Sequence, residues 1–194
     1  MPIAPTESAL ESWLEQAANR EKSGRYSDLK LEPIRAVLRH LPPVPRPVTL
    51  AGTKGKGSTT RLLESILLAH GQRTLAFTSP HVRTVRERWR LDGRLATAGE
   101  LAEAVCVVEG AEGAAGLRLT YFERCFALAC VLAAGHGGEF LCEVGLGGRL
   151  DCANALDARL AICTRLDYDH VQILGHTLGE IAGEKLAIAR ADAL

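Results

Sequence analysis

The segment from Gly52 to Thr59, Gly-Thr-Lys-Gly-Lys-Gly-Ser-Thr, constrains the fold of this chain more than any other. It follows a β-like run at 47–51 and precedes a helical pattern at 60–70. Three glycines allow the backbone to curl so that several N–H groups point inward, at the end of a helix that carries partial positive charge. A strand, a glycine-rich loop with a lysine and hydroxyls, and then a helix predict a phosphate-binding loop for a nucleoside triphosphate.

Within this loop, Lys56 is predicted to contact the β- and γ-phosphates, and Ser58 and Thr59 supply hydroxyls at the start of the helix. The residues predicted to bind the nucleotide, ATP, are Gly52, Thr53, Gly55, Lys56, Gly57, Ser58 and Thr59. The alternative is a flexible connection between a strand and a helix. Lys54 is either an additional cation near the phosphates or an exposed loop lysine.

Composition describes an ordinary globular chain. Its 194 residues suffice for one sizeable domain, with 47% hydrophobic and 24% charged residues. The formal net charge is zero, which gives no reason to expect a nucleic acid as partner. The longest apolar stretch, 125–135, is too short to cross a bilayer, so no membrane partner is expected.

Six cysteines occur without a CxxC pair. Five of them lie in apolar runs and are predicted to be buried free thiols: Cys106, Cys125, Cys130, Cys142 and Cys163. The first five residues lack the basic start and apolar core of a signal peptide. Both observations indicate a cytoplasmic protein.

Hydrophobic periodicity predicts alternating strands and helices. Helices are expected at 6–19, 29–41, 57–70, 98–109, 120–134 and 177–190, and strands at 48–51, 73–79, 139–145 and 159–166. Residues 80–95 are predicted to be a polar, arginine-rich loop with a turn at Asp92-Gly93, and 110–116 a loop of small residues. This alternation predicts an α/β fold with a mostly parallel sheet flanked by helices.

A proline-rich linker at 42–47 divides the chain. Residues 1–47 are predicted to form an N-terminal helical segment with this linker. Residues 48–194 are predicted to form the ATP-binding domain, and the two parts to pack as one unit.

Three polar residues follow predicted strands, where α/β sheets place their ligands. Ser79, Glu143 and His170 carry oxygen or nitrogen donors and together predict a Mg²⁺ site. Each has an alternative: Ser79 is a turn residue before Pro80, Glu143 is salt-bridged to an arginine such as Arg149, and His170 is a loop histidine.

A second glycine-rich segment, 145–151, allows a close approach of the backbone to a ligand. In it, Arg149 is a candidate clamp for an anion and Asp151 a candidate acceptor from a polar ring; a plain turn is the alternative. Composition alone predicts that Lys185 is an exposed lysine on a helix. Arg83, Arg86, Arg88 and Arg90 are predicted to form a solvated face that could steer an anionic substrate.

Taken in order, these motifs resemble a known family. They are 51–59, Thr78-Ser79-Pro80-His81, Thr120-Tyr121-Phe122-Glu123, 143–151, Asp169-His170 with Leu174-Gly175, and 181–185. The set resembles the folylpolyglutamate synthase/dihydrofolate synthase family of the Mur ligase superfamily, over residues 10–190.

The resemblance implies a P-loop NTPase-like Mur ligase central domain and an ATP-dependent amide ligase. A carboxylate on a pterin or folate would be phosphorylated by ATP, and the amine of L-glutamate would attack the acyl phosphate. The small-molecule substrates implied are therefore pterin or folate, L-glutamate and ATP, and the protein would be monomeric.

The resemblance also implies residue roles. Lys56 would hold the β/γ-phosphates, Ser79 and Glu143 would ligate one Mg²⁺, and Glu143 with His170 a second. Lys185 matches the lysine that the family carbamylates next to the metals. Four residues fall where the family contacts the pterin: Thr120, Phe122, Asp151 and Cys152.

Three departures from the family pattern stand out. Lys54 replaces the usual asparagine, which is expected to alter nucleotide affinity, and Cys152 replaces a common alanine. Family members carry a second α/β domain, whereas these residues end at Leu194, so only the first domain is expected. A cell-wall Mur ligase and a nucleotide-binding module without ligase activity are the alternative functions. The motifs do not distinguish dihydrofolate synthesis from polyglutamate extension.

Overall fold

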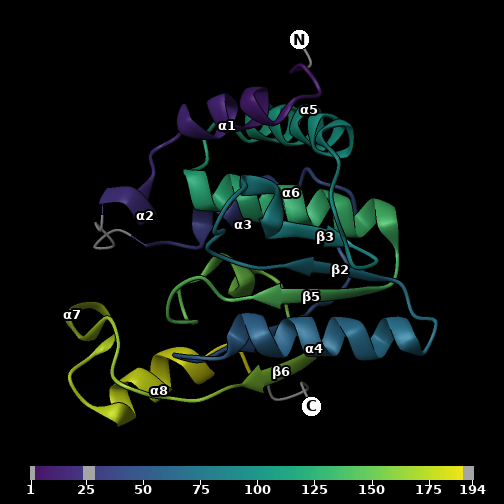
Figure 1. Cartoon of the computed structure of the whole chain (residues 1–194). Helices are drawn as coiled ribbons and strands as arrows, with labels where there is room; N and C mark the ends of the chain where they lie inside the picture. The colour runs from purple at the N-terminus through teal and green to yellow at the C-terminus, as the bar shows by residue number, and fades with distance from the viewer. Residues whose placement is uncertain (1–2, 24–28, 190–194) are drawn as a thin grey trace.

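The computed structural model describes residues 3–23 and 29–189 (Figure 1). The helices are α1 Glu7–Glu15, α2 Arg20–Ser23, α3 Glu32–Leu38, α4 Lys56–Ala69, α5 Ala98–Ala115, α6 Tyr121–His136, α7 Val171–Leu174 and α8 Leu178–Leu186, with 3₁₀ turns η1 Val85–Arg88 and η2 Cys152–Ala155. The strands are β1 Val48–Ala51, β2 Thr74–Phe77, β3 Trp89–Leu91, β4 Arg94–Leu95, β5 Glu139–Glu143 and β6 Leu160–Cys163.

The strands form one six-stranded sheet in the order β4-β3-β2-β5-β1-β6. Strands β2, β5, β1 and β6 are parallel to their neighbours in that order, and β3 and β4 add an antiparallel edge. The predicted α/β fold with a mostly parallel sheet is confirmed. Because β1 lies between β5 and β6, the loop that follows it opens at the middle of the parallel strands.

Helices cover both faces of the sheet (Figure 1). On one face, α6 packs on β2, and α5, α3 and α1 pack around α6 in the larger hydrophobic core. On the other face, α4 covers a smaller core built from Val48, Leu50, Ala76 and Leu141. Burial on two faces explains the continuous apolar runs of β1, β2 and β5. Helices α1 and α3, which precede residue 47, thus share a core with α5 and α6. The division of the chain into residues 1–47 and 48–194 stays a prediction.

Two tryptophans anchor their elements to α6. The indole Nε1 of Trp89 donates to the carbonyl oxygen of Cys125 at 2.9 Å. On the opposite side, Trp13 of α1 lies under the Arg124 guanidinium, 4.3 Å from the ring centroid. Arg124 is held in turn by the buried carboxylate of Glu112, with Nε to Oε1 at 2.9 Å. Both faces of α6 are therefore fixed by a large side chain and a hydrogen bond.

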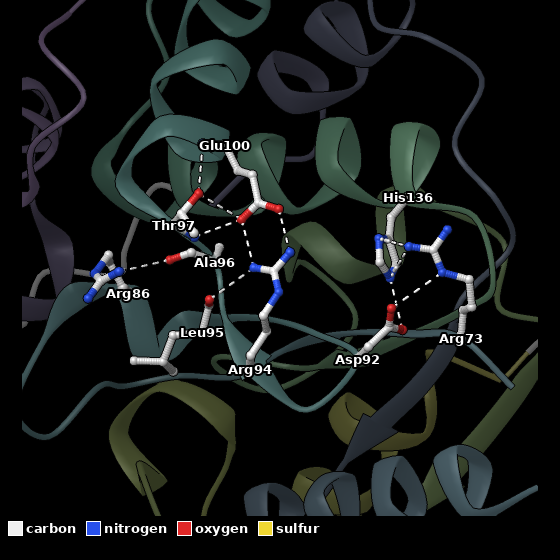
Figure 2. Close-up of polar contacts among 9 residues, drawn as sticks. All are labelled: Arg73, Arg86, Asp92, Arg94, Leu95, Ala96, Thr97, Glu100 and His136. Atoms are coloured by element: carbon white, nitrogen blue, oxygen red, sulfur yellow. Dashed lines mark hydrogen bonds and ion pairs between the residues drawn. The ribbon is translucent and has the colours of Figure 1, made fainter. Parts of the chain in front are cut away.

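Of the segment predicted as a polar loop, 80–95, residues 80–84 are irregular and the turn at Asp92-Gly93 is confirmed, whereas the rest forms η1 and the β3–β4 hairpin. Asp92 sits in this turn with a φ of 47°. Its carboxylate accepts from the Thr74 backbone N at 2.9 Å, and it contacts Arg73 and His136 (Figure 2). The turn is thereby held to the start of β2 and the end of α6.

The prediction of a solvated arginine face is wrong for all but Arg83. Arg88 is fully buried, and Arg86 and Arg90 are partly buried. Their partners are acids from α1, α2 and α4, in the ion pairs Arg86–Glu7, Arg88–Glu21 and Arg90–Glu64. Such distant partners neutralise a charge that is otherwise too costly to bury, and local sequence does not reveal them.

Three smaller corrections concern helix length and thiols. Helix α5 runs to Ala115, so the loop predicted at 110–116 is helical except at its end. Cys106 and Cys163 are exposed, whereas Cys125, Cys130 and Cys142 are buried as expected. None of the helices in 3–23 and 29–189 combines the length and hydropathy needed to cross a bilayer.

Candidate active site

The predicted phosphate-binding loop connects β1 to α4. Gly52 and Gly55 adopt φ angles of 149° and 88°, conformations that side chains disfavour. Gly55 is the N-cap of α4 and has no side chain to cover the first N–H groups of the helix. The loop is held from the other side by Thr53, whose backbone N donates to the Arg165 carbonyl at 2.8 Å and whose hydroxyl donates to the Asp167 carbonyl at 2.9 Å. The loop is therefore preformed, with its helix N-terminus open.

Two lysine amines meet beneath this loop. The Nζ of Lys56 donates to the Gly52 carbonyl at 3.1 Å, and the Nζ of Lys185 donates to the same oxygen at 3.2 Å. Lys185 is 3% exposed, so the view of it as an exposed helix lysine is wrong. Burial, and then the neighbouring charge of Lys56, lower the pKa of Lys185. The Gly52 carbonyl thus joins two lysine amines, of which the buried one, on Lys185, has a lowered pKa.

Glu143 ends β5 directly above α4. Its side chain is buried, and Oε2 accepts from the Ser79 backbone N at 3.4 Å. The same oxygen is 3.5 Å from where a Cβ on Gly57 would lie. Burial raises the pKa of Glu143 to about 7, against the opposing effect of the Lys56 charge. Such a buried carboxylate fits Mg²⁺, because the ion prefers oxygen ligands and compensates buried negative charge.

The alternative partner of Glu143 is excluded by the position of Arg149. Arg149 forms an ion pair with Glu184 on α8, and its backbone N donates to the Glu184 carbonyl at 2.9 Å. The arginine therefore anchors α8 to the second glycine-rich loop.

His170 is exposed at the start of α7, and its Nε2 lies 3.7 Å from the carboxylate of Asp169. Its role as a metal ligand stays a prediction. In the described part of the chain, no three His, Cys, Asp or Glu side chains gather closely enough to hold a metal ion. The structure thus brings together Ser79 and Glu143 of the predicted metal ligands.

The four residues expected to contact a pterin line one pocket. Its walls are Arg20, Glu21, Leu29, Lys30, Thr120, Phe122, Glu123, Gly145, Leu146, Leu150, Asp151 and Cys152. The Phe122 ring lies against Gly145, where an added Cβ would be 2.5 Å from the ring, so glycine is required there. A pocket that combines apolar side chains such as Phe122 and Leu146 with polar ones such as Thr120 and Asp151 suits an aromatic heterocycle.

Asp151 holds the backbone of the loop that lines this pocket. Its oxygens accept from the backbone N of Gly145 and Leu146 at 3.0 Å each and of Ala153 at 2.9 Å. Burial raises the pKa of Asp151 to about 6 even though these N–H groups favour the charged form. Asp151 therefore fixes the second glycine-rich loop, and its contact with a ring stays a prediction.

Sequence reasoning missed several residues around the site. Thr164 donates to the carbonyl oxygens of Ala51 and Lys54 and so closes the phosphate-binding loop. Its place near the end of the strand predicted at 159–166 was the available signal. Glu21 and Lys30 of the pocket wall lie far from every motif, and nothing local marks them.

Glu143 gives a prediction about stability and pH. Its folded-state pKa of about 7 exceeds the unfolded value of 4.5, so the folded chain holds an extra proton between these values and loses stability as pH rises. We expect Glu143→Gln to be more stable than the parent at pH 8, by roughly 2–3 kcal/mol. The advantage should shrink toward zero near pH 4.5, as measured by urea unfolding at several pH values.

Glu100→Gln is the matched control with the opposite sign. Its hydrogen bonds from Arg94 hold the pKa of Glu100 at about 2, so the charged form stabilises the fold above the unfolded value of 4.5. This variant should be destabilised at pH 8. Equal stability of Glu143→Gln and the parent at pH 8 would contradict the assigned burial cost.

Known proteins give the context for these sites. No family model matches the sequence. The chain is 39% identical over 191 residues to the dihydrofolate synthase/folylpolyglutamate synthase of Haemophilus influenzae, covering 94% of this chain and 42% of that protein. The Escherichia coli protein of the same name is 36% identical over 189 residues, covering 95% and 44%.

Solved structures agree. E. coli FolC in complex with DHPP and ADP matches with a TM-score of 0.84 at 37% identity, covering 95% of this chain and 44% of that one. The bifunctional folylpolyglutamate synthase/dihydrofolate synthase from Yersinia pestis CO92 matches with a TM-score of 0.85 at 34% identity, covering 100% and 47%. The chain spans less than half the length of these relatives. Within that span, sequence and fold agree: the chain belongs to the dihydrofolate synthase/folylpolyglutamate synthase family.

Proposed function

We propose that this chain is the ATP-binding part of a ligase that joins a folate or dihydropteroate carboxylate to the amine of L-glutamate. The observation that carries the proposal is the course of the chain after β5. Glu143 lies against Gly57 in the first turn of α4 and accepts from the Ser79 backbone N, and Gly145, two residues later, lines the Phe122 pocket. A carboxylate on a ring in that pocket would thus lie near the γ-phosphate of a nucleotide on the loop.

The reaction needs a phosphoryl transfer followed by an acyl transfer. ATP would phosphorylate the carboxylate to an acyl phosphate, and the glutamate amine would displace phosphate to form the amide. Lys56 and the open N–H groups of α4 would bind the phosphates. Mg²⁺, when bound by Ser79 and Glu143, would offset charge on the transferring group. A second ion held by Glu143 and His170 stays a prediction from the resemblance.

Lys185 is proposed to carry the carbamate that the family resemblance implies. A lysine must be uncharged to react with carbon dioxide, and burial next to Lys56 lowers the pKa of Lys185 toward that state. The modified side chain would replace the buried amine by a carboxylate-like group next to the phosphate-binding loop. Mass spectrometry in bicarbonate buffer, compared with Lys185→Met, tests for the modification.

The ligase assay measures the amide product and ADP from dihydropteroate or tetrahydrofolate, with ATP, Mg²⁺ and L-glutamate. It should be run on this chain and on the longest natural form of the protein that contains it. Product that requires both ATP and glutamate supports the proposal. Nucleotide binding without any product from either pterin substrate, or displacement of the pterin by a UDP-sugar, would contradict it.

We also propose that the protein acts in the cytoplasm as a monomer. Its six cysteines are all free, and four are buried, as is usual where thiols stay reduced. Light scattering after size-exclusion chromatography measures the oligomeric state.

A further inference from the structure

Arg88 is a fully buried arginine that no part of the proposed reaction uses. It is 1% exposed, and its guanidinium lies 5.4 Å from the centroid of the Tyr121 ring. Its Nη1 and Nη2 donate to the two carboxylate oxygens of Glu21 at 3.2 and 2.6 Å. Its Nε donates to His81 Nδ1 at 3.0 Å. A guanidinium this buried is tolerated because its donors are paired.

The two partners of Arg88 belong to different parts of the site. Glu21 lies on α2 and lines the pocket that also contains Thr120 and Phe122. His81 lies two residues after Ser79, in the loop whose Ser79 backbone N donates to Glu143. Arg88 therefore contacts one wall of the Phe122 pocket and also the loop that contains Ser79, a proposed metal ligand.

The α2 helix has only four residues, too few to be stable alone. The forked contact from Arg88 fixes both oxygens of Glu21 and so sets the direction of that side chain. Lysine could supply the charge at this position but has neither the fork nor a third donor in the same plane. The geometry thus favours arginine for positioning as well as for charge.

We propose that Arg88 is a positioning residue for the pterin-bearing substrate, acting through Glu21 on the wall of the Phe122 pocket. The inference rests on the proposed function for the identity of the ligand. Arg88 fixes the position of Glu21 in the pocket wall, and its hydrogen bond to His81 holds that wall at a constant distance from the loop that contains Ser79. Substrate affinity depends on this contact, and nucleotide affinity does not.

Arg86 provides a matched control. It lies on the same 3₁₀ turn, is partly buried, and also bridges to the N-terminal helices through Glu7, with Nε to Oε2 at 3.1 Å. It does not line the pocket. Arg86→Met should therefore destabilise the chain without changing the pocket.

The test compares Arg88→Met, Arg88→Lys and Arg86→Met in this chain. Binding of pteroate and of Mg-ADP is measured by isothermal titration calorimetry, with thermal unfolding as a check of folding. We expect Arg88→Met to weaken pteroate binding by about tenfold or more, the effect of losing a buried charged hydrogen-bond partner. Arg88→Lys should lie between it and the parent. Mg-ADP binding should stay within about twofold in all three variants.

A double-mutant cycle with Glu21→Gln shows whether Arg88 acts through Glu21. Once Glu21 is replaced, Arg88→Met should have little further effect on pteroate binding. Pteroate affinity that is unchanged in folded Arg88→Lys and Arg88→Met, or equally reduced in Arg86→Met, would overturn the inference.

Hydrogen exchange separates this outcome from a failure of the proposed function. A peptide covering residues 18–23 should exchange faster in both Arg88 variants than in the parent or Arg86→Met, because α2 loses its anchor. If the peptide exchanges faster in the Arg88 variants but the parent chain binds no pteroate, the proposed identity of the ligand is wrong, while the positioning of Glu21 by Arg88 is still supported. Unchanged exchange would refute the role of Arg88 whatever the ligand.

Discussion

Replacing Lys56 by alanine should weaken Mg-ATP binding by about 100-fold, because a charge-assisted contact worth about 3 kcal/mol is lost. Lys56 begins α4, and its amine donates to the Gly52 carbonyl at 3.1 Å. The amine can exchange this carbonyl oxygen for a phosphate oxygen. Calorimetry with a non-hydrolysable ATP analogue measures the change.

Folding stability should hardly change in this variant, since a partly exposed loop lysine contributes little packing. Lys54→Ala is the matched control in the same loop. Lys54 is exposed, and its amine is 4.0 Å from the Asp167 carboxylate. A loss of at most about twofold is expected there. Retained affinity in Lys56→Ala would remove the phosphate-binding role of this loop.

Gly52→Ala should damage both the fold and the site. Gly52 has a φ of 149°, and an added Cβ would lie 1.9 Å from the hydroxyl oxygen of Thr164. That contact is impossible, so either the loop or the segment after β6 must move. We expect a loss of about 2–4 kcal/mol in the free energy of unfolding, together with loss of nucleotide binding. Urea unfolding and calorimetry measure the two effects.

Two variants separate the clash from the backbone conformation. Gly55 also has a positive φ, 88°, but a Cβ added there would meet nothing within 4 Å. Gly55→Ala should therefore lower the free energy of unfolding by about 1–2 kcal/mol through backbone strain alone. Adding Thr164→Ala to Gly52→Ala removes the clashing oxygen and should restore part of the stability. If Gly52→Ala alone folds and binds as the parent does, the loop geometry described for this chain is wrong.

The elements that sequence predicted well are those whose signal is local. The apolar runs of β1, β2 and β5 and the loop 52–59 were placed within a few residues because burial on both faces and phosphate binding impose their own residue types. The end of α5 was missed because Gly110 and Gly113 weaken a helix in isolation. Packing decides otherwise here, as Ala111 and Glu112 are buried.

The site divides in the same way. The residues at strand ends, Ser79 and Glu143, meet because parallel strands end at one edge of the sheet. The burial of Lys185 depends on α8 docking against the second glycine-rich loop, through the Arg149 backbone N and the Glu184 carbonyl at 2.9 Å. The pairing of Arg88 with Glu21 joins residues 67 positions apart. Such contacts between distant segments have no local signature.

The two tryptophans that flank α6 determine what intrinsic fluorescence can report. Both indoles are almost fully shielded from solvent, Trp13 at 3% and Trp89 at 0% exposure, and both lie on the side of the sheet opposite α4. Their emission should be blue-shifted and should monitor the helical layer. A spectral change when nucleotide is added would therefore signal a rearrangement transmitted across the sheet, and a silent titration would mean that the layer stays rigid while the loop is occupied.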